Sequence, residues 1–139
     1  MSGFENAKNF FEACETPLGW DGCKEFVAEG ATFTAQSEPI ADIDTIEGYC
    51  DWMKAFGTVT AAGATYELHA SAWDDSTRTA LFFATYNATH VGDGGPVPPT
   101  GHSTNSHYVY VLTMDDADRV AAFTKVWNAP WAMRDLGWT

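Results

Sequence analysis

Residues 103–128, STNSHYVYVLTMDDADRVAAFTKVWN, decide the fold of this chain of 139 residues. Polar and apolar side chains alternate through much of 103–114, and 119–128 has a similar pattern, which is the period of two that a β-strand imposes. Between them, the acidic stretch from Asp115 to Asp118 is typical of a tight turn. Strands joined by so short a connection pair antiparallel, so this stretch predicts a long β-hairpin.

Two more strands are predicted upstream of the hairpin. Residues 64–73 alternate strictly enough to place Tyr66 on one face and Trp73 on the other. Residues 78–91 form a longer and more apolar strand, and a Gly- and Pro-rich loop at 92–101 connects it to the hairpin. The length of this loop suits the rim or lid of a binding pocket.

Helical spacing replaces strand alternation in the first half of the chain. Ser2 and Glu5 have the spacing of a capping box, and apolar residues recur three and four positions apart behind them. Further helices are predicted at about 21–29 and 46–56, with a short strand at 31–35 between them. A run of helices followed by a run of strands predicts an α+β fold.

We assign 1–139 to one domain, since the chain has neither a linker nor a repeat. Its mostly antiparallel sheet is expected to curve around the N-terminal helices and to leave a pocket between the two layers. Residues 130–136, which begin with a proline, predict a short C-terminal helix.

The charge of the chain excludes several kinds of partner. Its 19 acidic and 7 basic residues give a net charge of −12, and the basic residues are scattered along the sequence. Nucleic-acid binding depends on clustered Lys and Arg, and anionic membrane surfaces attract basic segments. We therefore predict neither a nucleic-acid nor a membrane partner. No apolar run approaches the roughly 18 residues of a membrane-spanning helix.

The cysteines and the first residues of the sequence indicate a cytoplasmic protein. Cys14, Cys23 and Cys50 are odd in number and contain no CxxC pair, so we interpret them as buried, reduced thiols. The first residues contain neither the basic nor the apolar segment of a secretory signal. His102 and His107 lack the further ligands that a metal site needs, so no metal is predicted.

Five short segments in the last third of the chain form a recognisable series. They are HVG at 90–92, VPPTG at 97–101, DDADRV at 115–120, WN at 127–128 and MRDLG at 133–137. In this order they resemble the SnoaL-like, polyketide cyclase-like branch of the NTF2-like superfamily. The resemblance implies a helix-lined cone with an internal pocket and a homodimer formed through the outer face of the sheet.

The resemblance also implies which positions would be catalytic. SnoaL-like cyclases are expected to use an Asp on the last strand and a His on the strand before it. The matching positions in this sequence are Lys125 and Tyr110, so both residue types are replaced. We therefore do not expect aldol cyclisation by that mechanism.

The candidate catalytic residues are therefore sought among the other polar side chains of the hairpin. His107 and Lys125 are candidates for proton transfer, because His titrates near neutral pH and burial lowers the pKa of a Lys. Tyr110 is a candidate donor of a hydrogen bond to an oxyanion. Strand alternation places His107 and Tyr110 on opposite faces, and the sequence leaves open which face is inside. The candidate substrate-binding residues are Asn105, Tyr108, His90, Trp127 and Trp73.

Two functions remain open at this stage. The first is an enzyme without a cofactor that transfers protons on a small apolar carbonyl or polycyclic substrate, as an isomerase, cyclase or lyase would. The second is a non-catalytic module that binds a small apolar or aromatic molecule or forms a dimer. A shared cavity for His107 and Lys125 would support proton transfer by these two residues, and opposite faces of the sheet would exclude it.

Overall fold

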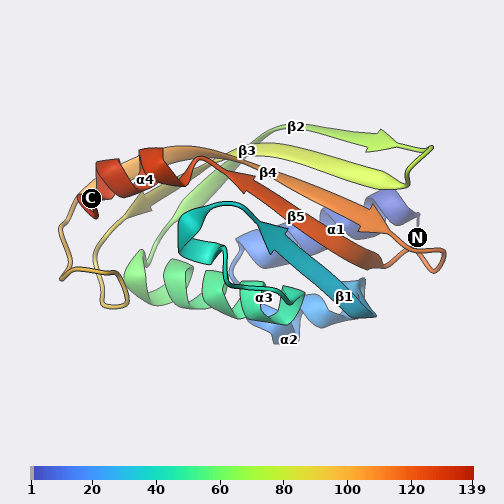
Figure 1. Ribbon diagram of the computed structural model, residues 1–139, viewed down its shortest axis with the longest axis horizontal. Helices are drawn as coiled ribbons and strands as arrows, with labels where there is room; N and C mark the ends of the chain where they lie inside the picture. The colour runs from blue at the N-terminus through green and yellow to red at the C-terminus, as the bar shows by residue number, and fades with distance from the viewer. Residues whose placement is uncertain (1) are drawn as a thin grey trace.

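A five-stranded sheet covers three N-terminal helices in the computed structural model, which describes residues 2–139 (Figure 1). The helical segments are α1 (Gly3–Glu15), α2 (Gly19–Cys23), η1 (Lys24–Phe26), η2 (Glu38–Ile40), α3 (Ile46–Ala55), η3 (Phe56–Thr60) and α4 (Ala129–Leu136). The strands are β1 (Val27–Ala35), β2 (Thr65–Asp74), β3 (Thr79–Thr89), β4 (Ser103–Met114) and β5 (Val120–Trp127).

The sheet has the strand order β1-β5-β4-β3-β2, so the predicted hairpin of β4 and β5 lies at its centre. β1 pairs parallel with β5, and the other neighbours pair antiparallel. The predicted α+β fold, with a mostly antiparallel sheet and N-terminal helices, is confirmed.

The first helix packs across the inner face of the sheet. Its N-cap is Ser2, whose hydroxyl accepts a hydrogen bond from the Glu5 N–H at 3.1 Å, as the capping pattern predicts. The ring of Phe11 stacks on Phe82 of β3, with centroids 4.9 Å apart, and meets Tyr110 of β4 edge-on at 4.8 Å. These aromatic contacts join α1 to the middle of the sheet.

The helix predicted at 21–29 is too long. α2 ends at Cys23, a 3₁₀ turn follows, and β1 already begins at Val27. The reason is tertiary: β1 pairs with β5, starting with Val27 opposite Val120, and this pairing overrides a helical pattern of only a few residues. The predicted strand at 31–35 is therefore only the second part of β1, beyond a register shift that includes Gly30 in the left-handed region.

The prediction that Tyr66 and Trp73 lie on opposite faces of their strand is wrong. A register shift between Leu68 and Ala70 adds one residue to β2, and the side-chain alternation changes sides there. Tyr66 consequently meets Phe11 edge-on at 5.6 Å. Trp73 also faces the helices, and stacks on a ring of α1, Phe4, at 5.9 Å.

Alternation is regular in β4 and fixes the inner face. On β4, Tyr108 and Tyr110 are buried against the helices, whereas His107 is exposed on the other side. On β5, Lys125 is buried on the inner face. The outer face of the sheet carries large apolar side chains that remain exposed, namely Leu81, Phe83 and Val126, and Trp131 of α4 lies beside this face.

The loop after β3 and the helix α4 lie together at one end of the sheet (Figure 1). His90 anchors the loop, since its Nδ1 accepts hydrogen bonds from the Thr100 N–H at 3.3 Å and from the Trp138 indole at 3.0 Å. Gly92 allows the loop to approach η3, because a Cβ at this position would lie 2.1 Å from the carbonyl oxygen of Val59.

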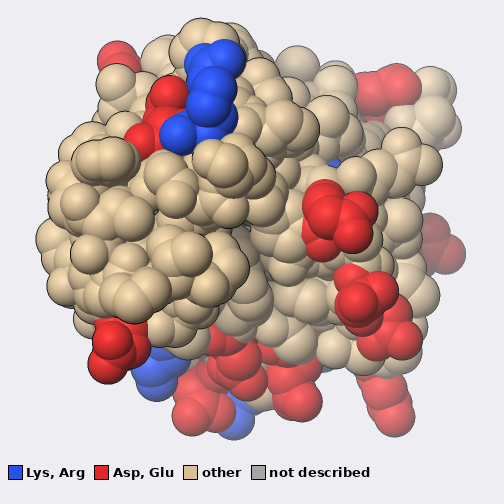
Figure 2. Space-filling view, turned by 60° about the vertical axis from the view of Figure 1, so that its left-hand side comes forward, with Lys and Arg blue, Asp and Glu red and all other residues tan. Residues whose placement is uncertain are grey.

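The chain is acidic, with a net charge of −12. On the face shown in Figure 2, Asp and Glu are spread over the surface, and Lys and Arg form no continuous area. None of the helices within residues 2–139 has both the length and the apolar composition of a membrane span.

Candidate active site

A buried lysine is the central feature of the space between sheet and helices. Lys125 is 5% exposed, and its partner across the hairpin is Tyr110. Its Nζ donates a hydrogen bond to the hydroxyl of Tyr49, from α3, at 2.6 Å. The hydroxyls of Tyr49 and Tyr110 lie 3.3 Å apart, within hydrogen-bonding distance. The three residues therefore form one chain of polar groups inside an apolar core.

Aromatic rings surround the lysine ammonium. Burial lowers the pKa of Lys125 to about 8, and the negative charge of Glu15 opposes this shift. Cation–π attraction stabilises the charged form, so the amine can hold or release a proton near neutral pH. The ring centroids lie 4.9 Å (Tyr49), 5.1 Å (Tyr108), 5.2 Å (Trp127), 5.9 Å (Trp52) and 6.0 Å (Tyr110) from Nζ.

A buried carboxyl group belongs to the same cluster. Glu15, the last residue of α1, is 3% exposed, and neither of its carboxylate oxygens makes a hydrogen bond. Burial raises the pKa of Glu15 to about 7, and the positive charge of Lys125 opposes the shift. The hydroxyl of Tyr108, also buried without a hydrogen-bond partner, interacts with this carboxyl group. An acid and a base thus have pKa values near neutrality in one water-poor space, as proton transfer requires.

A small cavity adjoins this cluster. It has a volume of about 20 Å³, close to the space that one water molecule needs. Lys125 and Tyr108 both line it, so the two residues border the same space. The remaining lining is Trp52, Met53, Phe56, Tyr86 and Trp127.

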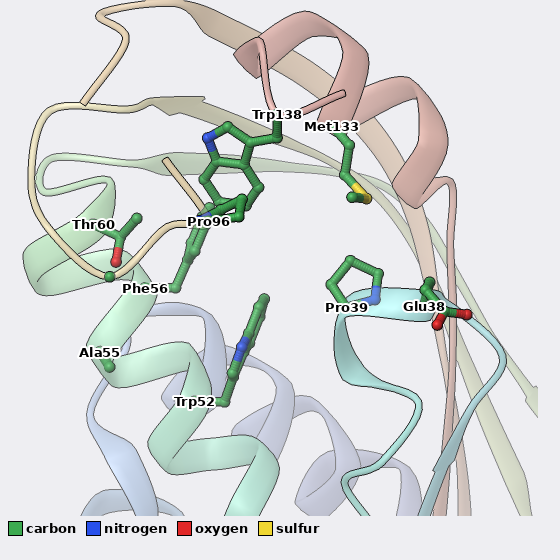
Figure 3. Close-up of a pocket in the computed structure, with 10 residues that line it drawn as sticks. Glu38, Pro39, Trp52, Ala55, Phe56, Thr60, Pro96, Met133 and Trp138 are labelled. Carbon is green, nitrogen blue, oxygen red and sulfur yellow. The ribbon is translucent and has the colours of Figure 1, made fainter. Parts of the chain in front are cut away.

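A larger, mostly apolar pocket lies outside the small cavity. It has a volume of about 360 Å³ and is built from η2, α3, η3, the loop after β3 and the C-terminal residues. In Figure 3, Trp52 and Phe56 project from one side of this pocket, and Met133 and Trp138 lie on the other. Trp52 and Phe56 also line the inner cavity, and their rings stack 5.3 Å apart. This pair therefore separates the apolar pocket from Lys125.

The structure brings together four of the residues proposed from the sequence. Lys125, Tyr108, Tyr110 and Trp127 all face the inner space, and the Trp127 indole donates a hydrogen bond to the Ser106 hydroxyl at 3.1 Å. These residues are contributed by the inner faces of β4 and β5.

His107 and Asn105 do not join this group. Both are exposed on the outer face, beside a shallow pocket of about 150 Å³ that Trp131 also lines. The His107 ring lies against Phe83, at 5.6 Å between centroids. His107 and Lys125 thus face opposite sides of the sheet, which excludes the mechanism in which these two residues share one cavity.

His90 and Trp73 have other positions. His90 is buried in the loop anchor, next to Trp138 at the rim of the apolar pocket. Trp73 lies at the far end of the sheet against Phe4, and lines neither the inner cavity nor the apolar pocket. Trp73 therefore has a packing role on the inner face.

Reasoning from the sequence missed Glu15, because acidic residues were sought only on the strands. A signal was available: Glu15 follows Phe11 by four residues, so it falls on the apolar face of the first helix. A carboxylate on such a face is either paired or has a raised pKa. Trp52 and Phe56 were missed because aromatic residues of a helix usually pack in a core.

No family model matches the sequence, and no curated protein matches it. The fold, by contrast, matches solved structures over nearly its full length. IdmH from Streptomyces antibioticus, a proposed polyketide cyclase, has a TM-score of 0.77 at 13% identity, covering 99% of each chain. A proposed SnoaL-like polyketide cyclase from Jannaschia sp. CCS1 has a TM-score of 0.73 at 15% identity, covering 94% of this chain and 90% of that chain.

An NTF2-like protein from Burkholderia thailandensis E264 has a TM-score of 0.72 at 16% identity, with 94% of both chains covered. Other matching structures bear the names of a hydroxylase and of epoxide hydrolases, so one fold serves several reactions among them. The likeness to SnoaL-like and NTF2-like structures extends over nearly the whole chain, and the protein therefore has the NTF2-like fold.

Proposed function

We propose that this protein is a small-molecule enzyme that transfers a proton on an apolar carbonyl substrate, with Lys125 as the base. The observation that carries the proposal is the buried amine, with its pKa lowered to about 8, beside a cavity that adjoins an apolar pocket. Structures named as polyketide cyclases share the fold, which favours small-molecule chemistry of this kind.

The pocket indicates the class of substrate. Most of its lining is apolar or aromatic, and Glu38 is the charged residue at its edge. Its volume of about 360 Å³ suits a bicyclic or larger apolar ring system. The carbonyl group would enter last, toward the inner cavity, once the rings of Trp52 and Phe56 turn aside.

Four polar groups of the cluster have a role in the proposed step. The neutral amine of Lys125 takes a proton from the carbon next to the carbonyl, and the C–H electron pair becomes part of an enolate. The free hydroxyl of Tyr108 donates a hydrogen bond to the enolate oxygen. Tyr110 positions Tyr49, which holds the lysine. The ammonium then returns the proton to carbon, so the step needs no cofactor.

Hydrogen exchange of a simple ketone tests this proposal without knowledge of the natural substrate. In D₂O, the protein should accelerate deuterium uptake by 1-tetralone, a bicyclic ketone, above the rate in buffer. Lys125→Met should abolish the acceleration, and His107→Ala should retain it. Acceleration that survives in Lys125→Met would remove the lysine from the mechanism.

The barrier formed by Trp52 and Phe56 favours a second function, the binding of a small apolar molecule without catalysis. The inner cavity of about 20 Å³ holds no substrate unless this pair moves. Quenching of tryptophan fluorescence by 1-tetralone, with no acceleration of exchange for it or for larger ketones, would support this alternative.

We also propose that the protein forms a homodimer through the outer face of its sheet. Apolar side chains from β3 and β5 are exposed there, including Phe83 at 40% and Val126 at 57%. A patch of this kind usually marks an interface. Sedimentation should show a dimer at micromolar concentration, and Phe83→Glu should convert it to a monomer. A wild-type monomer would contradict the proposal.

A further inference from the structure

The three cysteines of the chain meet in one place, although they are far apart in the sequence. Cys14 lies on α1, Cys23 ends α2, and Cys50 lies on α3. Their sulfur atoms all lie within 4.8 Å of one another, and all three residues are at most 1% exposed. All three are free thiols. Three helices thus direct three soft ligand atoms to a common centre.

The three thiols lie close enough to interact with one another directly. A thiolate is the form of cysteine that binds metals.

We propose that Cys14, Cys23 and Cys50 form a three-coordinate site for a single Cu(I) ion. Three sulfurs at roughly 2.3 Å from one metal lie about 4 Å from each other, so small side-chain rotations bring these sulfurs to the required positions. Thiolate ligands select soft ions such as Cu(I). This site uses none of the residues proposed for proton transfer.

The number of ligands favours copper over zinc. Structural zinc sites almost always have four ligands. Within residues 2–139, these three sulfurs are the one group of three or more His, Cys, Asp or Glu ligand atoms that lie close enough together to hold a metal ion. No fourth ligand atom in this part of the chain joins them. A three-coordinate, all-sulfur arrangement therefore suits a soft monovalent ion better than Zn²⁺.

The surrounding charges and the exchange of protons are compatible with a bound cation. The negative charges of Asp51 and Glu15 interact electrostatically with Cys23, and the ammonium of Lys125 interacts electrostatically with Cys14. Each thiol that binds the metal does so as a thiolate, and its proton passes to the solvent. Copper enters as Cu(I), so no oxidant or reductant takes part.

The short helix α2 provides a route for the ion. It has only five residues, and its N-cap residue, Leu18, makes no capping hydrogen bond, while Asp51 of α3 accepts one from the Trp20 N–H at 3.1 Å. Such a segment opens locally at a lower free energy than the whole domain. Opening of α2 would expose Cys23 first and then the other two sulfurs.

Copper binding by the complete protein tests the proposal. Purified protein would be supplied anaerobically with Cu(I) and titrated with bicinchoninate, a coloured Cu(I) chelator. One Cu(I) per chain should be retained, and Cys50→Ser should weaken its binding by about 100-fold or more, since a ligand matters at least as much as a group that supports one. Met53→Leu, a buried sulfur residue of the same helix, is the matched control and should bind as the wild type does.

X-ray absorption spectroscopy of the copper-loaded wild-type protein tests the site without any substitution. Three sulfur neighbours and no nitrogen or oxygen around copper are expected. Transfer of all copper to the chelator, equal retention by Cys50→Ser, or a nitrogen ligand in the absorption spectrum would each overturn the assignment. Retention of Zn²⁺ in preference to Cu(I) would also overturn it.

Discussion

The two faces of β4 both carry polar aromatic side chains, but one face is buried and the other is exposed to solvent. Tyr108 and Tyr110 face a closed space with Lys125 and Glu15, and the pKa values of all four residues are shifted by burial. One position away, His107 is exposed to solvent beside Phe83. The residue type that is most often catalytic thus lies outside, and the types less expected lie inside. The comparison teaches that burial, more than residue type, creates the reactive groups of this protein.

The largest effect is expected from the inner carboxyl group. The pKa of Glu15 is raised from 4.5 to about 7, so the folded state binds more protons than the unfolded state between these values. The free energy of unfolding should therefore fall as pH rises through this range, by about 3 kcal/mol in total. Glu15→Gln should lack this fall, as measured by urea unfolding between pH 4.5 and 8.

Glu12→Gln provides the matched control, because Glu12 is exposed on the same helix. It should keep the pH dependence of the wild type. Identical curves for wild type and Glu15→Gln would mean that the carboxyl group is hydrated, and the contrast between the two faces of the sheet would be weaker than we infer.

The inner lysine should give a change of similar size in the opposite direction. Its pKa is lowered from 10.5 to about 8, so burial of the ammonium costs stability below pH 8, and this cost disappears as pH rises toward 10.5. Lys125→Met should stabilise the protein at pH 7 by up to about 3 kcal/mol and should lack the rise with pH. Thermal unfolding between pH 7 and 9.5 measures both effects, and Lys54→Met, at an exposed position of α3, is the control. A less stable Lys125→Met at pH 7 would contradict the prediction.

Only part of the inner face of the sheet could be predicted from the sequence. Alternation along 103–128 predicts the hairpin and groups Tyr108 with Tyr110, because a strand has a fixed period. It does not decide which face is inside, since both faces carry apolar and polar residues. That choice depends on the helices, which pack on the face with Tyr110 through Phe11.

Other features depend on contacts between distant segments, which no local pattern contains. The inward position of Trp73 follows from one extra residue in β2, and the start of β1 at Val27 follows from its pairing with β5. The contact of Glu15 with the strand residues required the docking of α1. The helical spacing of Glu15 behind Phe11 was nevertheless visible in the sequence.

A smaller effect is expected at Tyr49, whose hydroxyl binds the Lys125 amine. Tyr49→Phe removes the hydroxyl that accepts the Nζ hydrogen bond at 2.6 Å, and with it a contact that favours the charged amine. The pKa of Lys125 should fall further below 8, and the protein should lose about 1–2 kcal/mol of stability. NMR titration of the lysine ε-carbon signals measures the pKa. Tyr66→Phe, a half-buried tyrosine of β2, should leave it unchanged.

The smallest effect is expected on the outer face. This prediction is the most direct test of the contrast between the two faces of the sheet. His107 is exposed and makes a ring contact with Phe83, so His107→Ala should change stability by less than about 0.5 kcal/mol. Its rate of 1-tetralone exchange should stay within about twofold of the wild type, because no inner group touches it. A loss of exchange as large as that of Lys125→Met, with folding intact by circular dichroism, would mean that the chemistry occurs on the outer face. The shallow pocket beside Asn105 and Trp131 would then replace the inner cavity as the active site.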